Sequence, residues 1–201
     1  MQTKKMMFVI TFLSMLFLIT GCSLFSPVKG PDNTFLIRTV PCPHEKWPGR
    51  PINLLVLPTG SNSIYNTTDM AYSTSCYQLS FYAKNGWAAP PARMMQPLLV
   101  ETLQRTHYFH VVDSAPISAS YDYVLSTQLI ELRQVFCGCH SEVHLKVSAQ
   151  LTNTATNRVI ASREFEVIEP AAPNPCGGVI AANRAMAYVL NQIANFCLRK
   201  L

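Results

Sequence analysis

The sequence has few charged residues and no run of basic ones. Charged residues make up 13% of the 201 positions, with 16 Lys and Arg against 11 Asp and Glu. Most basic residues lie singly, as at Arg38, Arg93 and Arg133, whereas nucleic-acid-binding segments cluster them. Removal of Lys4 and Lys5 with an amino-terminal signal leaves 14 basic against 11 acidic residues, a net charge of about +3. We therefore expect no binding to nucleic acid.

The sequence also lacks the short motifs that carry common enzymatic chemistry. It contains no G-x-S-x-G, G-x-G-x-x-G, phosphate-loop or H-E-x-x-H pattern. His107, His110 and Asp113 lie close in the sequence, but nothing fixes their spacing to a serine nucleophile. No clear pair of carboxylates for acid–base catalysis is present. We predict a protein that is not an enzyme and has no catalytic residues, cofactor or metal.

Only one long apolar stretch is present, and it lies at the amino terminus. Lys4 and Lys5 precede an uncharged segment from Met6 to Thr20, which is the organisation of a secretory signal. These 15 residues are fewer than the ~20 that a membrane-spanning helix needs. A permanent transmembrane span is therefore not expected.

Residues 19–22, Ile-Thr-Gly-Cys, resemble the lipobox of bacterial lipoproteins. The resemblance implies a signal peptide at residues 1–21 and acylation of Cys22, and two or three acyl chains give durable membrane attachment. Ser23 stands where that pattern has Asp for retention in the inner membrane, so the resemblance implies an outer-membrane anchor facing the periplasm. The alternative is an ordinary cleaved signal with a chance cysteine.

Residues 22–34 predict a lipidated tether, and residues 35–201 predict one domain. The tether contains two prolines and a glycine without periodicity, and it spans ~35 Å if extended. About 180 residues follow the signal, which is enough for one domain with its own core.

Six further cysteines are candidates for disulfide bonds, because an even number in an exported chain is compatible with bridges. The segment from Cys137 to His144, "CGCHSEVH", contains two cysteines and two histidines that could bind zinc as an alternative. Cys-Gly-Cys is tighter than the usual spacing of zinc ligands, and a bridge within it would be a small, strained ring. We expect structural bridges or buried thiols, with a metal site or redox dithiol as alternatives, at Cys42, Cys76, Cys137, Cys139, Cys176 and Cys197.

Apolar patterns predict several strands in the first half of the domain. A first strand is expected at Phe35 to Thr39, and the continuous apolar run from Ile52 to Pro58 predicts a strand buried on both faces. The aromatic segment from Tyr72 to Trp87 predicts a hairpin, with Asn85-Gly86 as a tight turn. Residues 110–113 predict a short strand that lies parallel to the Ile52 strand.

The second half predicts a three-strand meander. Residues 123–132 alternate imperfectly, whereas residues 142–151 alternate cleanly between an apolar face and a polar one. The turn residues "NTATN" then lead into residues 158–168 as an antiparallel partner.

Two segments have helical spacing of apolar residues. One follows Pro91 and carries the stripe Met94, Met95, Leu98, Leu99 and Leu103, with an expected pair between Glu101 and Arg105. Pro97 requires this helix either to begin there or to kink. The other spans residues 177–198. We predict an α/β (α+β) single domain: a mixed sheet with an antiparallel meander, packed against two main helices.

The aromatic hairpin has two interpretations. Aromatic side chains supply much of a core's buried area, yet Tyr and Trp also anchor interfaces. We expect Tyr77, Tyr82 and Trp87 to contact a partner or a neighbouring subunit, with core packing as the alternative.

The segment "YQLSFYAKNGWAAPPARMMQPLLVETLQRTHYFHVV" resembles the central block of the ABC-type transport auxiliary lipoprotein family, which includes PqiC-like proteins. The matching positions include Trp87, Pro90, Pro91, Phe109 and Val111. The resemblance implies a fold like the amino-terminal domain of TolB, and a role beside an ABC transporter and MCE-domain proteins that move phospholipids between membranes. It further implies docking or stabilisation of the MCE assembly by a homo-oligomer.

Two other functions remain as alternatives. A lipid-binding carrier needs an apolar cavity, which the Ile52 strand would line. A thiol- or metal-dependent periplasmic enzyme needs a reactive cysteine of low pKa at position 137 or 139.

Overall fold

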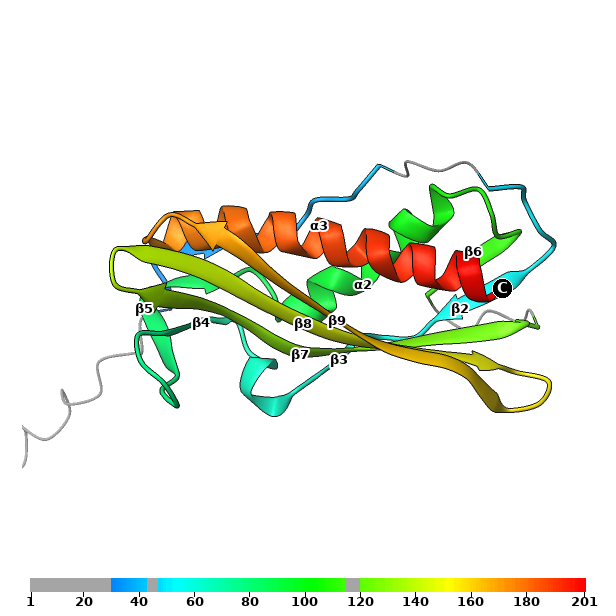
Figure 1. Cartoon of the computed structure of the whole chain (residues 1–201), viewed down its shortest axis with the longest axis horizontal. Coiled ribbons are helices and arrows are strands. Elements are labelled where there is room, and N and C mark those ends of the chain that lie inside the picture. The colour runs from blue at the N-terminus through cyan, green and yellow to red at the C-terminus, as the bar shows by residue number, and fades with distance from the viewer. Residues whose placement is uncertain (1–29, 43–46, 115–119) are drawn as a thin grey trace, which may run out of the picture. The chain divides into compact units, whose positions relative to one another are not determined.

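A computed structural model describes residues 30–42, 47–114 and 120–201, and its strands form one mixed sheet (Figure 1). The long strand β7 (Tyr123–Cys137) pairs antiparallel with β8 (His140–Asn153), which pairs antiparallel with β9 (Arg158–Ala171). This arrangement confirms the predicted meander and the hairpin turn before Arg158.

The other edge of β7 pairs with short parallel strands at different heights. These are β2 (Asn53–Val56), β3 (Gly60–Ser61) and β4 (Asp69–Ser73). The strand β6 (Val111–Asp113) lies parallel to β2, as predicted. The strand β5 (Ser80–Trp87) pairs antiparallel with β4, and β1 (Asn33–Phe35) pairs parallel with β5. A short 3-10 helix, η1 (Ser63–Tyr65), follows β3.

A bulge in β7 explains why its sequence alternates imperfectly. Leu125 and Leu129 are buried, but the register with β8 shifts between Leu129 and Glu131. Because a bulge inserts one extra residue, the inward-facing set moves by one position after it. Leu132 and Gln134 are therefore the buried residues in the second half of the strand.

The strand β8 has the two faces that its sequence predicts. On one face Val143, Leu145, Val147, Ala149 and Leu151 are all buried in the core. On the other face, the Lys146 Nζ lies 3.1 Å from a carboxylate oxygen of Glu164 and 3.7 Å from one of Glu166.

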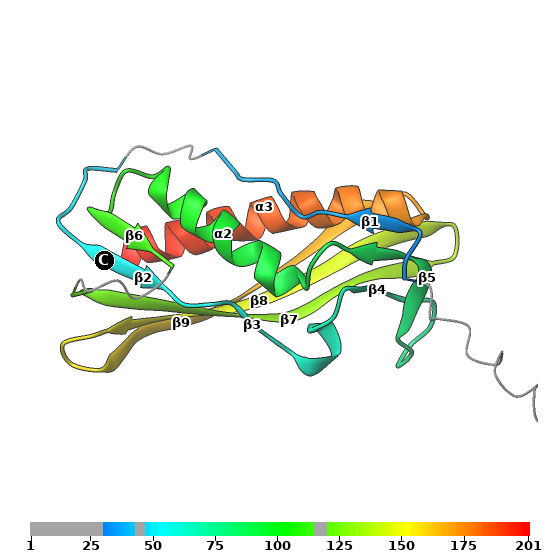
Figure 2. The same ribbon diagram turned by 180° about the vertical axis from the view of Figure 1, so that it is seen from behind.

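Two helices cover one face of the sheet, as Figures 1 and 2 show from opposite sides. They are α2 (Pro91–Gln104) and α3 (Pro175–Lys200). The predicted methionine and leucine stripe of α2 is buried, and the apolar residues of α3 join the same core. The mixed α/β fold class with two helices is thus confirmed, whereas the likeness to TolB stays a prediction.

Pro97 lies inside α2, because the helix begins at Pro91. The alternative that the helix begins near Pro97 is wrong. Pro97 is exposed, so the backbone carbonyl that loses a hydrogen bond to the proline is on the solvent side, where water can bind it. The expected surface pair is present, with 2.6 Å between Arg105 Nη2 and Glu101 Oε1.

Two local predictions are corrected. The first strand is Asn33–Phe35 and does not reach Thr39. After Phe35 the chain bonds to a helix instead of a strand: Arg38 N donates to Asn183 Oδ1 at 3.0 Å, and Asn183 Nδ2 donates to Leu36 O at 3.0 Å.

The Asn85-Gly86 pair forms no turn, since it lies inside β5. The glycine instead permits close approach of two other segments. A Cβ at Gly86 would lie 2.9 Å from the Pro31 ring and 3.2 Å from Thr68 O. The turn between β4 and β5 lies earlier, at residues 74–79.

The predicted signal peptide, Cys22 and the tether up to residue 29 lie outside the described residues. The compact unit that contains the sheet begins at Pro31, four residues before the predicted boundary at 35. In the described part of the chain, every helix is too short or too polar to cross a bilayer.

Candidate functional site

Trp87 ends β5 and lies in the hydrophobic core. Its side chain is 6% exposed, and its backbone is fixed on two sides: Trp87 N donates to Thr68 O at 2.6 Å, and Phe35 of β1 is its strand partner. The structure therefore favours the core interpretation for Trp87, because a partner has almost no surface of this side chain to contact.

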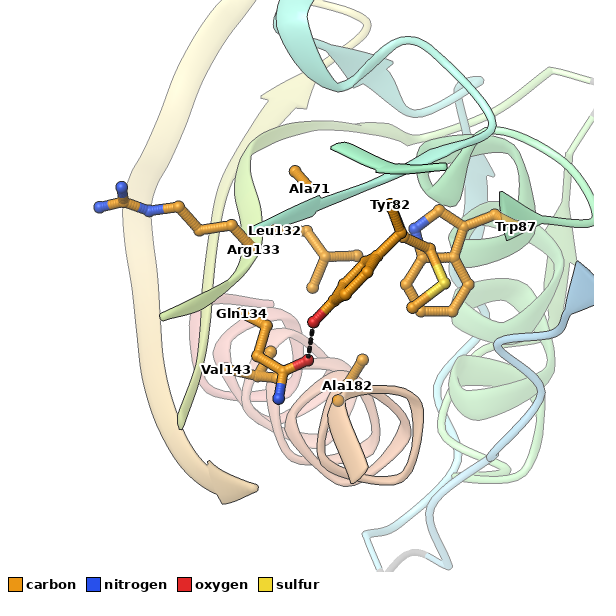
Figure 3. Close-up of a pocket in the computed structure, with 10 residues that line it drawn as sticks. Ala71, Tyr82, Trp87, Leu132, Arg133, Gln134, Val143 and Ala182 are labelled. Atoms are coloured by element: carbon orange, nitrogen blue, oxygen red, sulfur yellow. Dashed lines mark hydrogen bonds between the residues drawn. The ribbon is translucent and has the colours of Figure 1, made fainter. Parts of the chain in front are cut away.

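Tyr82 lies beside Trp87 and points toward a polar group in the core (Figure 3). Its ring packs on the ring of Tyr72, with centroids 4.6 Å apart. Its hydroxyl donates to Gln134 Oε1 at 3.0 Å. Burial, with a smaller contribution from Tyr72, raises the pKa of Tyr82 to about 12. The phenol is thus held neutral, as a hydrogen-bond donor.

Gln134 is the centre of a buried hydrogen-bond network. Its amide nitrogen lies 2.8 Å from Ser141 Oγ and 3.1 Å from Ala172 O, and it also reaches Asn174 O. Gln134 is on β7, Ser141 on β8, and Ala172 and Asn174 precede α3. The network therefore joins three elements at one end of the sheet, and buried polar groups require such partners.

The start of α3 is built around the same glutamine. Asn174 caps the helix, since its side-chain oxygen accepts from Gly177 N at 2.8 Å. A Cβ at Gly178 would lie 2.2 Å from Gln134 Oε1. A larger residue at position 178 would force Gln134 Oε1, which accepts from the Tyr82 hydroxyl, to move.

The space enclosed by this cluster is small. A gap of about 10 Å³ lies among residues that include Tyr82, Trp87, Leu132, Val143 and Ala182 (Figure 3). This volume is about the minimum for one water molecule, so the gap cannot hold an acyl chain.

Two residues of the buried strand β2 are packed in the core and line no cavity. Leu54 and Val56 are fully buried in the core. Leu55 instead borders an open surface recess, between residues 120–124 and the turn after Asn153. The lipid-carrier alternative, which needs an apolar cavity along this strand, thus finds no support in the packing of Leu54 and Val56.

Tyr77 lies apart from Tyr82 and Trp87. It is in the turn between β4 and β5, has a positive φ of 62° and is fully exposed at 108%. Among the three predicted contact residues, Tyr77 is on the surface, Tyr82 is half-buried and Trp87 is buried. Contact with a partner stays a prediction for these residues.

The six cysteines of the described chain are free thiols in this structure. The expected bridges are thus absent from it, and the pairing of the cysteines stays a prediction. Cys197 is fully buried, and burial raises the pKa of its thiol to about 12. The other five, at positions 42, 76, 137, 139 and 176, are exposed.

The Cys-Gly-Cys segment is explained by a turn. β7 and β8 are joined through Gly138 and Cys139, with Cys137 opposite His140. Gly138 has a φ of 62°, which glycine adopts readily in a two-residue hairpin turn. Within residues 30–42, 47–114 and 120–201, no three His, Cys, Asp or Glu side chains are grouped to hold a metal ion.

Two polar residues of structural importance were not predicted from the sequence. Gln134 reaches the core because of the bulge at Ile130, and a single sequence gives little sign of a bulge. Asn183 joins α3 to residues 36–38 through side-chain bonds. Its position on the helix, one turn after the buried Val179, was the available signal.

The fold and the closed aromatic cluster define a small α/β domain with a filled core. A family model for the ABC-type transport auxiliary lipoprotein component matches residues 44–194. The chain therefore belongs to this family.

Two solved structures have a similar fold. Protein XCC0632 from Xanthomonas campestris, of the DUF330 family model, has a TM-score of 0.75 at 20% identity, covering 83% of this chain and 95% of that one. An uncharacterised protein has a TM-score of 0.66 at 17% identity, covering 84% of this chain and 99% of that one. Among curated proteins, none matches the sequence significantly.

Proposed function

We propose that this protein is a lipid-anchored, non-catalytic component of an intermembrane lipid transport system. Cys22 carries the anchor in the outer membrane, and the domain faces the periplasm as a homo-oligomer. There it docks or stabilises an MCE-domain protein that works with an ABC transporter. Membership of the ABC-type transport auxiliary lipoprotein family supports the transporter as a partner.

The observation that carries the proposal is where the chain enters the sheet. The near end of the sheet is defined by the turns at residues 74–79 and 138–139 and the start of α3; the far end is defined by the turn at residues 154–157 and the end of α3. β1 pairs with β5 in the near half (Figure 2).

Only eight residues, 23–30, separate Cys22 from Pro31. From Cys22 to Pro31 the extended chain therefore reaches at most about 30 Å. An acylated Cys22 thus keeps the near end close to the bilayer and leaves the far end for a periplasmic partner.

The test is recovery of the partner from cells that produce the chain with Cys22 or with Cys22→Ser. We expect radioactive palmitate to label the first chain alone, and the MCE-domain protein to co-purify from the membrane fraction with the first chain and much less with the second. Cys42→Ser is the control, because Cys42 is an exposed thiol outside the lipobox. Equal recovery with Cys22→Ser, or no MCE-domain protein with either chain, contradicts the proposal.

A further inference from the structure

We infer that a recess between β9 and the carboxy-terminal half of α3 binds a phosphate group. The recess has a volume of about 220 Å³. Arg163 of β9 lines one side, and Gln192, Asn195, Phe196 and Arg199 of α3 line the other. Four of these five side chains are polar and can donate hydrogen bonds, and none is acidic.

Arg163 is held in place by an aromatic platform. Its guanidinium carbon lies 5.1 Å from the ring centroid of Phe165, within the range of a cation–π contact. Phe165 is 2% exposed, and its ring meets that of Phe196 edge to face at 5.9 Å. Because this platform is part of the core, the guanidinium is preorganised for a ligand.

The two arginines of the recess are among those that form no ion pair with the described residues. Arg105, Arg133 and Arg184 each pair with a glutamate. Among the described residues, neither Arg163 nor Arg199 forms a salt bridge. The neighbouring Glu164 and Glu166 lie beside Lys146, on the other face of the sheet. Two like charges at one recess repel each other, and an anion between them removes the repulsion.

The dipole of α3 explains the position of only one of these two arginines. Arg199 lies in the last turn of α3, where a cation is favoured by the helix dipole. This effect does not explain why Arg163, on a different element, lines the same recess.

The donor set fits phosphate better than a carboxylate. A single guanidinium fork satisfies the two oxygens of a carboxylate. Two forks with two carboxamides, from Gln192 and Asn195, offer donors to the three or more oxygens of a phosphate. The phosphate belongs either to a lipid headgroup or to a free phosphate compound. The inference does not depend on the transport partner proposed above.

The test is calorimetry of glycerol 3-phosphate with the full mature chain in a neutral detergent. We expect binding that weakens as salt increases, and that becomes about tenfold weaker or more in Arg163→Gln and in Arg199→Gln. Arg163→Lys keeps the charge but loses the fork, so its affinity should fall between those of the wild-type and Arg163→Gln chains. Arg93→Gln is the matched control, because Arg93 is an exposed arginine on α2; it should bind as the wild-type chain does.

Vesicle flotation of the Cys22→Ser chain distinguishes the two sources of phosphate. Arg163-dependent binding to phosphatidylethanolamine vesicles containing phosphatidylglycerol indicates a lipid headgroup. Binding of glycerol 3-phosphate without vesicle binding indicates a free phosphate compound. The inference is overturned if glycerol 3-phosphate does not bind, if both glutamine variants bind it like Arg93→Gln, or if an acidic peptide binds more tightly. If the wild-type chain binds no glycerol 3-phosphate while recovery of the MCE-domain protein is intact, this inference alone is overturned.

Discussion

The near and far ends of the sheet use polar side chains differently. At the near end, Gln134 is buried and bonded to Tyr82, Ser141 and the segment before α3. In the far half, Arg163 and Arg199 are exposed at an open recess and make no ion pair with the described residues. The Gln134 network thus stabilises the near end of the fold, whereas Arg163 and Arg199 are open to a ligand.

Residues of the Gln134 network should be tested for stability, and the two arginines of the recess for binding. A buried network is costly to break because each lost partner leaves a desolvated group. An exposed cation contributes little to stability. Substitutions at the near end should therefore change unfolding, while those in the far half should change binding without unfolding the domain.

The largest stability loss is expected for Trp87→Ala. Removing a buried tryptophan should lower the free energy of unfolding by about 3–5 kcal/mol, which urea unfolding measures. Phe81→Ala on the same strand is the control: Phe81 is 43% exposed, so we expect a loss of about 1 kcal/mol or less. Similar losses in the two variants would show that Trp87 is not a core residue.

A smaller loss is expected for Gln134→Met, which removes the centre of the network but keeps its length. The Tyr82 hydroxyl then has no acceptor, and Ser141 and Ala172 lose a donor. We expect the free energy of unfolding to fall by about 2–3 kcal/mol, again by urea unfolding. Gln128→Met is the control, because Gln128 is exposed on the same strand. If Gln134→Met were as stable as this control, the network would not stabilise the near end.

The hydroxyl of Tyr82 predicts a pH dependence. Its pKa is raised from 10.0 to about 12 by burial, so the unfolded chain loses this proton at lower pH than the folded one. The corresponding stability is present below pH 10 and decreases as the pH rises to about 12.

Tyr82→Phe should lower the free energy of unfolding by about 1 kcal/mol near neutral pH. It should also reduce the loss of stability between pH 10 and pH 12, which unfolding curves over this range measure. Part of the loss of stability at high pH should remain in Tyr82→Phe, because burial also raises the pKa of Tyr65. An unchanged pH dependence would contradict the assignment of this effect to Tyr82.

The smallest effect is expected at a surface pair on α2 that belongs neither to the Gln134 network nor to the recess. Glu101 and Arg105 are 2.6 Å apart, but their side chains are each almost half exposed. Glu101→Gln should therefore lower stability by about 0.5 kcal/mol or less, and salt should reduce the difference. Thermal unfolding at low and high salt measures it, and a loss above 1 kcal/mol would contradict the expectation for exposed pairs.

The sequence predicted the elements whose apolar pattern is regular. The alternation of β8 and the helical stripes of α2 and α3 follow from burial on one face, and the structure confirms them. The ends of elements depend on contacts with distant segments and were predicted less well. Gly86 lies inside a strand, with Pro31 and Thr68 close against it, and local turn preference does not reveal this.

The candidate sites could be predicted only in part. The aromatic hairpin was recognised, but its sequence does not distinguish the buried Trp87 from the exposed Tyr77. Gln134 enters the core through a bulge, and Arg163 meets Arg199 only because α3 packs against β9. The positions of these side chains depend on tertiary packing and not on their spacing along the chain.

In the proposed arrangement, the near end of the sheet stays by the bilayer while the far end meets the transport partner. Photo-crosslinking in intact cells tests this arrangement, with a crosslinking amino acid at Ala155 in the far turn or at Cys139, an exposed residue of the near turn. We expect a covalent adduct with the MCE-domain protein from position 155, and little or none from position 139. An adduct from position 139 alone, or from neither position, would contradict the proposal.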